Sequence, residues 1–210
     1  EAGPAEEVEA RLRTVQPLVE LRVPFVLERE EIDAAARGAE DADWDPLIDA
    51  AERLARGEDT AVFHGYGAAG IHGLAADSEH APVSLSSDYT EYPRAVTEAI
   101  EKLREAGVDG PYAIALGPRC DAGLRRTVDA GGYPVLRHVQ RLLDGPDVWA
   151  PALDGAVVLS MRGGDFRLVV GRDPRVGYLG HDEQRVRLYL EESFTFRLLG
   201  PEAAVPLVYR

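Results

Sequence analysis

Alternating apolar positions mark the first regular stretch of the chain. Between Thr14 and Leu27, valine, leucine and phenylalanine recur at mostly every second position, as in a strand with one buried face. Pro17 and Pro24 remove two backbone donors, which gives this strand an edge-like character. Such a strand is hard to bury within one subunit. We therefore expect it to lie across a neighbouring copy of the chain.

A helical period of about 3.6 residues follows and recurs through the middle of the chain. The longest apolar stripe begins where Asp45 and Pro46 form a good helix start, and it continues to Tyr66. A stretch rich in Gly, Ala and Ser between Gly67 and Ser87 has neither period and predicts a loop. The predicted helices cover 30–37, 45–66, 93–107, 121–128 and 134–143.

Short β-like segments dominate the last third of the chain, where Gly, Pro and Asp separate them. The predicted strands cover 112–116, 157–160, 166–170, 186–190, 193–198 and 203–208. Because helices are concentrated in the middle and strands at the end, the fold class is predicted to be α+β.

Charge narrows the range of partners. The 210 residues include 37 Asp and Glu against 23 Lys and Arg, a formal net charge of −14, and no basic run interrupts the excess. Nucleic acids and anionic membranes are poor partners for such a surface. No apolar run reaches the roughly 18 residues that a membrane span needs. With Cys120 as the single cysteine, no intramolecular disulfide can form, and a cytoplasmic location fits best.

Two motifs invite a ligand interpretation but lack its context. Residues 65–70 match the spacing G-x-G-x-x-G, yet they follow a predicted helix rather than a strand, so a helix-terminating loop is the better interpretation. His64, His72 and His80 recur every eight residues without a metal-binding spacing, and we interpret them as ordinary surface or core histidines. No metal site is expected.

The candidate catalytic residues also lack the sequence context that catalysis needs. Cys120 and His138 could form a nucleophile and base, but nothing flanking them suggests activation, and a buried structural thiol is favoured. Glu191 and Glu192 are adjacent on a predicted strand, so their side chains face opposite ways and cannot act as an acid/base pair. We interpret both as charged solvent positions. The residues alone therefore predict no catalytic site.

Several separate segments, in order along the chain, carry a family resemblance. They include PLVELRVPFVL, AAERLARGEDTAVFHGY, GVDGPYAIAL, GGYPV, WAPALDGAVVLSMRGGDFRLVVGRD and VRLYLEESFTFRLLGPEAAV. With them the chain resembles an encapsulin, the linocin-like shell protein of bacterial nanocompartments, whose fold is that of the capsid of bacteriophage Hong Kong 97. The resemblance covers the chain almost from end to end.

The resemblance implies a division into capsid-type domains. Residues 1–27 would be the returning arm of an extended loop that pairs with neighbouring subunits. Residues 28–92 and 166–210 would form the peripheral domain with its long spine helix, and 93–165 the axial domain. The tip of the axial domain would line the fivefold pore with Asp129, Ala130, Gly131, Gly132 and Tyr133.

The resemblance also implies partners. The chain would assemble with itself and enclose a cargo protein, a dye-decolorising peroxidase or a ferritin-like protein, bound through a C-terminal targeting peptide. Asp173, Val176 and Tyr178 are candidates for one half of the cargo site; the family forms the other half with an N-terminal helix, to which no segment of residues 1–210 corresponds.

Three further expectations follow from the same comparison. Some members carry a flavin, but Glu30 stands where they have an aromatic residue, so no cofactor is expected although Arg22 matches. A phage major capsid protein is the structural alternative, and acidity argues against its packing of nucleic acid. A hydrolase or a bacteriocin is the third alternative, disfavoured by the lack of a nucleophile, base and metal set.

Overall fold

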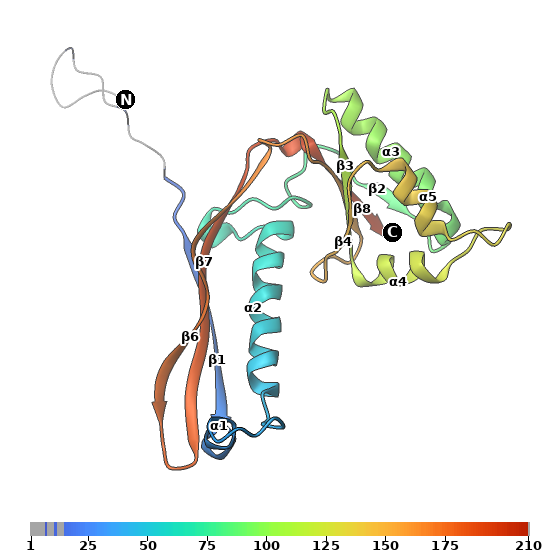
Figure 1. The fold of residues 1–210 in the computed structure, drawn as a ribbon. Helices are drawn as coiled ribbons and strands as arrows, with labels where there is room; N and C mark the ends of the chain where they lie inside the picture. Colours follow the sequence, from blue (N-terminus) through green and yellow to red (C-terminus); the bar gives the residue numbers. More distant parts are fainter. Residues whose placement is uncertain (1–6, 8–10, 12–14, 210) are drawn as a thin grey trace.

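Two β-sheets organise the subunit (Figure 1). The computed structural model describes residues 7, 11 and 15–209. A long three-stranded sheet has the order β1-β7-β6, and a five-stranded sheet has the order β2-β8-β5-β3-β4. Helices and strands are both abundant, as the α+β prediction requires.

The long sheet is antiparallel and consists of β1 (Val19–Glu28), β6 (Phe166–His181) and β7 (Arg185–Leu198). The predicted strand begins at Thr14, which lies outside the described residues. The expectation that this strand is hard to bury within one subunit is wrong, because β1 pairs with β7 along its whole length and Phe25 and Leu27 are buried. Its edge character is confirmed: among the described strands β1 has β7 as its one partner, so Pro24 is tolerated.

The two strands of the β6–β7 hairpin are longer than predicted. The segments 186–190 and 193–198 are parts of one strand, β7, and the segment 166–170 continues to His181 as β6. The register of β6 shifts between Val170 and Arg172, again before Arg175, and once more after Tyr178. These bulges and their glycines interrupt the alternation that sequence analysis relies on.

The helix α2 (Asp45–His64) lies along one face of the long sheet (Figure 1). Its apolar side, including Ala50 and Leu54, packs on Phe25 and Leu27 of β1 and on Leu190 of β7. The shorter helix α1 (Arg29–Ala36) follows β1 directly and lies at the end of the sheet. Both helices were predicted within two residues at each end.

The second sheet is covered by helices. It contains β2 (Val83–Leu85), β3 (Tyr112–Leu116), β4 (Asp147–Trp149), β5 (Ala156–Ser160) and β8 (Ala204–Tyr209). The helices are α3 (Tyr92–Glu105), α4 (Pro118–Arg126) and α5 (Val135–Leu142), with 3-10 turns η1 (Gly67–Ala69), η2 (Tyr89–Glu91) and η3 (Pro201–Ala203). The strands β2 and β4 are too short to show a period and were not predicted.

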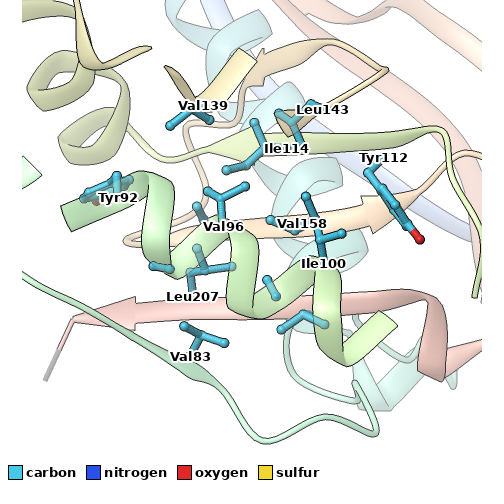
Figure 2. Close-up of a cluster of buried hydrophobic side chains, with 14 of the residues drawn as sticks. Val83, Tyr92, Val96, Ile100, Tyr112, Ile114, Val139, Leu143, Val158 and Leu207 are labelled. Carbon is cyan, nitrogen blue, oxygen red and sulfur yellow. The ribbon is translucent and has the colours of Figure 1, made fainter. Parts of the chain in front are cut away.

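Figure 2 shows the core under α3. Val96 and Ile100 lie among Ile114 of β3, Val158 of β5 and Leu207 of β8, all buried. A separate cluster joins the two sheets, because Phe194 and Phe196 of β7 pack with Val157 of β5 and Ala204 of β8. The two halves of the subunit therefore share a continuous apolar contact.

Two adjacent glutamates of β7 are buried, which corrects their interpretation as solvent positions. Glu191 is 1% exposed on the face away from α2, where Arg22, Arg172 and Arg175 donate to its carboxylate. These arginines, Arg175 above all, lower the pKa of Glu191 to about 2. The opposite orientation of the Glu191 and Glu192 side chains was predicted correctly, but the burial of these side chains was not.

Glu192 is 5% exposed and faces α2, and its Oε1 has no hydrogen-bond partner among the described residues. Burial, and then the Glu58 carboxylate on α2, raise the pKa of Glu192 to about 7. A buried carboxyl without a cation is favoured in its protonated form. Below about pH 7 Glu192 therefore holds a proton in a contact that joins α2 to the sheet.

We predict that Glu192→Gln stabilises the subunit at alkaline pH. The folded-state pKa of Glu192 lies above its value in the unfolded chain, so its stabilising contribution is complete at about pH 4.5 and is lost as pH rises through about 7. Relative to the parent, the variant should gain about 1 kcal/mol in free energy of unfolding at pH 9 and little at pH 5. Urea unfolding across this range measures the difference.

Glu191→Gln is the matched control. It should destabilise the subunit at neutral pH, because three guanidinium groups lose their shared carboxylate, and this loss should shrink as pH falls towards 2. Equal pH profiles for the parent and for Glu192→Gln would contradict the assignment of a bound proton.

Candidate functional surfaces

The predicted pore residues lie together in one exposed turn between α4 and α5. Figure 1 shows this turn projecting beyond the two helices. The Asp129 Oδ1 accepts hydrogen bonds from the backbone N–H groups of Gly131 (2.8 Å) and Tyr133 (2.9 Å). Gly132 has a φ of 79°, which favours glycine. The turn is therefore ordered by its own aspartate.

His138 of α5 completes the turn, since its Nε2 lies 2.8 Å from the Oδ2 of Asp129. This contact, followed by the backbone N–H of Tyr133, lowers the pKa of Asp129. Asp129 is thus an ionised side chain held against its own turn. The charge at this tip was expected from the resemblance, whereas the histidine that restrains it was not.

The three candidate cargo residues lie on β6, the outer strand of the hairpin. Val176 and Tyr178 are opposite Leu190 and Leu188 of β7, so they share the sheet face on which α2 lies. Because α2 packs chiefly on β1 and β7, this part of β6 is left uncovered. Val176 is 53% and Tyr178 58% exposed. Asp173 lies in the neighbouring bulge.

Two further apolar residues extend this surface, which we call the β6 stripe: Leu168, Val170, Val176 and Tyr178. Leu168 and Val170 are opposite Phe196 and Phe194, again on the α2 face, and both are exposed. They were not among the predicted site residues. The register that places them on one face could not be seen in the sequence.

A second open apolar surface lies on the other side of α2. It is a groove of about 480 Å³ between β1 and the helix, lined by Val19, Leu21, Gly57, Thr60 and Ala61. Leu21 lies close to Gly57, where an added Cβ would be 3.3 Å from its Cδ1. Helix α2 therefore has exposed apolar surface on both flanks.

Cys120 is confirmed as a buried structural thiol. It is fully buried, accepts a hydrogen bond from the Tyr92 hydroxyl (Oη to Sγ 3.0 Å) and lies 3.5 Å from that of Tyr209. Burial raises the pKa of the Cys120 thiol. His138 bonds to Asp129 instead, so the structure brings no base to this cysteine.

The three regularly spaced histidines bond to separate groups. The Nε2 of His64 is 2.8 Å from the carbonyl oxygen of Ala152, His72 pairs with Asp77, and His80 bonds to the carbonyl of Glu202. Over the described ranges, no cluster of three or more His, Cys, Asp and Glu side chains could hold a metal ion.

The glycine motif ends a helix, as predicted. Gly65 terminates α2 with a φ of 82°, and a Cβ there would lie 2.9 Å from the carbonyl oxygen of Ile71. Tyr66 and Ile71 then form a short bridge, with Gly70 in the left-handed region between them. No helix opens from this loop onto a phosphate site.

Arg22, which the resemblance links to a flavin, has acidic partners. It donates to the carboxylates of Glu191 and Glu20, and its guanidinium lies over the ring of Tyr189. These groups do not fit an anionic cofactor.

In the part of the chain that is described, no helix is long and apolar enough to cross a membrane.

Comparison with known proteins decides between the structural alternatives. Residues 1–195 match the linocin-type family model described as an encapsulating protein for peroxidase. The type 1 encapsulin shell protein of Rhodospirillum rubrum is 56% identical over 207 residues, which cover 98% of this chain and 74% of the relative. The chain belongs to the encapsulin shell protein family.

Solved structures with the same fold include capsids and capsid-like particles. The virus-like particle of Pyrococcus furiosus has a TM-score of 0.67 at 19% identity, covering 90% of this chain and 76% of that one. The structure from Mycobacterium phage Ogopogo has a TM-score of 0.65 at 14% identity, covering 100% of this chain and 83% of that one. The encapsulin therefore has the Hong Kong 97-type capsid fold.

This encapsulin is a self-assembling shell protein. Phage capsids share its fold at low identity, whereas the shell proteins share its sequence. Its relatives are structural shell proteins, and encapsulin shells form nanocompartments in bacteria.

We predict that the turn at 129–133 depends on Oδ1 of Asp129 as a hydrogen-bond acceptor more than on the charge of this side chain. Asp129→Asn keeps an oxygen acceptor for the N–H groups of Gly131 and Tyr133, whereas Asp129→Ala removes it. Hydrogen exchange of peptides spanning the turn should accelerate about tenfold in the alanine variant and little in the asparagine variant. Equal exchange in both variants would contradict the role given to Oδ1.

Proposed function

We propose that this shell takes up a cargo enzyme whose C-terminal peptide docks on the β6 stripe beside Asp173. The exposed apolar row on β6, left uncovered by α2, is the observation that carries the proposal. An extended peptide needs such a row to bury its own apolar side chains. The carboxylate of Asp173 adds a polar group at the bulge.

The expected affinity of a single peptide is modest. If about 200 Å² of apolar surface were buried, the gain would be about 5 kcal/mol before any ordering costs. That alone corresponds to a Kd near 0.2 mM. An oligomeric cargo that presents several peptides to one shell would bind far more tightly, because later contacts form at high effective concentration.

The proposed cargo is a dye-decolorising peroxidase or a ferritin-like protein. The description of the matching family, an encapsulating protein for peroxidase, supports the first. Purification of filled shells separates the two, since a peroxidase carries haem absorbance and a ferritin-like protein oxidises ferrous iron.

The division into domains belongs to the same proposal. The strands β6 and β7 with α2 support a peripheral domain of residues 28–92 and 166–210, and β3, β4 and β5 with α3, α4 and α5 support an axial domain of residues 93–165. Residues 1–27 would belong to an extended loop. Because β2 and β8 belong to the second sheet but fall in the proposed peripheral segments, the proposed boundary passes through that sheet.

The turn at 129–133 is proposed to line a pore, with Asp129, Ala130, Gly131, Gly132 and Tyr133 at its rim. Its exposure, its projection from the helices and the ionised Asp129 support this role. A ring of such carboxylates around a symmetry axis would favour small cations over anions.

We predict that Val176→Asp reduces cargo loading. A charge in the centre of the β6 stripe should lower the amount of cargo in each purified shell at least tenfold, because the peptide would have to desolvate a carboxylate. Val148→Asp is the matched control, since Val148 is similarly exposed (51%) but belongs to β4 of the second sheet. Unchanged loading with Val176→Asp, in shells of normal size, would place the docking site elsewhere.

We predict that Asp129→Asn weakens cation preference without disturbing the turn. Cargo turnover of a cationic substrate relative to an anionic one should fall several-fold at low salt and change little at high salt, since salt screens exposed charges. Unencapsulated cargo provides the reference ratio. The same ratio for parent and variant shells at low salt would show that traffic does not pass this turn.

A further inference from the structure

The face of the long sheet that points away from α2 is rich in arginine. All seven arginines of β1, β6 and β7 lie on it, as the pairing register and the alternation with core residues such as Phe194 require. The same face carries Glu20, Glu28 and Glu191, so seven positive charges against three negative ones leave a formal charge of +4. Figure 1 shows no helix over this surface, which we call the arginine face.

The rest of the chain has the opposite charge. With −14 overall and +4 on the arginine face, the remainder carries a formal −18. Counting Asp173 of the β6 bulge with the face would lower its charge to +3. A subunit with this segregation presents a basic surface within a strongly acidic molecule.

Part of the arginine face is neutralised within the subunit. Glu191 holds Arg22, Arg172 and Arg175, and Glu28 pairs with Arg185. Arg167 and Arg197 differ, because they lie directly opposite each other on β6 and β7. Both are exposed, and no carboxylate among the described residues forms an ion pair with either. Like charges directly opposite each other destabilise a sheet.

A complementary acidic segment lies at the other end of the subunit. Residues 30–52, which include α1 and the first turns of α2, contain nine Asp and Glu against Arg37 alone, a formal −8. None of the nine carboxylates forms an ion pair with a described residue. The segment is largely exposed.

The two surfaces cannot meet within one subunit. Arg197 lies twelve residues along β7 from Arg185, which pairs with Glu28 at the α1 end of the sheet. At about 3.3 Å per residue this separation is about 40 Å. In addition, α2 lies on the opposite face. Only a second copy can bring the acidic segment to Arg167 and Arg197.

We infer that the arginine face around Arg167 and Arg197 is an interaction surface for the acidic segment 30–52 of a second copy of this chain. Because the two surfaces are different, the contact is heterologous, the kind that generates closed rings and shells when the rotation between copies closes. The inference concerns assembly and is independent of the proposed cargo site. A nucleic acid is the competing polyanion, which the net charge of the whole subunit disfavours.

The test uses charge reversal in the protein expressed from its complete gene. Arg167→Glu with Arg197→Glu should raise the protein concentration at half-assembly at least tenfold, measured by light scattering after controlled disassembly. A milder pair, Arg167→Gln with Arg197→Gln, should give an intermediate shift. Arg94→Glu with Arg104→Glu, on exposed positions of α3, makes the same change in net charge and should assemble as the parent does. Thermal unfolding of each variant confirms that the subunit is folded.

The decisive arm is rescue between copies. Glu40→Arg with Asp41→Arg should also impair assembly, and mixing this variant with Arg167→Glu/Arg197→Glu should restore mixed shells. Parent-like assembly of Arg167→Glu/Arg197→Glu would overturn the inference, as would a loss that mixing does not restore. Shells that carry nucleic acid and dissociate on nuclease treatment would overturn it in favour of the competing polyanion.

Discussion

The burial of β7 is the constraint on which the rest of the subunit depends. Among the described strands of the long sheet it alone pairs on both edges, with β1 and with β6. Helix α2 covers one of its faces, and the guanidinium groups around Glu191 cover part of the other. Beyond Leu198 the chain passes through η3 directly into β8 of the second sheet. A slip of β7 by one residue would exchange its two faces. It would therefore disrupt both the cluster under α2 and the cluster that joins the two sheets.

Glu191 and Glu192 show two solutions to the burial of a carboxyl group. Glu191 is charged and shares three guanidinium groups from β1 and β6, so a slip of either neighbour would move an arginine out of reach. The cluster thereby specifies the register of both strands, which is the role in which buried charges are best attested. Glu192 has no cation beside it among the described residues and keeps its proton below about pH 7, which makes the packing of α2 on the sheet sensitive to pH.

Local periodicity predicted the parts of the fold that local forces decide. The helix α2 and the strand β1 follow directly from their apolar spacing. The partner of β1 and the full length of β6 depend on contacts between residues far apart in the chain, which periodicity does not contain. The same holds for the functional surfaces: Val176 and Tyr178 followed from resemblance, while Leu168, Val170 and the restraint of Asp129 by His138 required the register and the packing.

The distribution of charge over the fold is the feature that is least visible in the sequence. No basic run exists, because the arginines of the long sheet alternate with apolar and acidic residues and come from three strands, of which β1 lies more than a hundred positions before β6 and β7. Pleating alone gathers them on one face, since alternate side chains of a strand point the same way. A net charge of −14 therefore describes how the isolated subunit is kept soluble, while the segregation of charge describes how copies can attract one another. Contacts of this kind are weakened by salt and form in many copies, so a shell built on them can correct misplaced subunits before it closes.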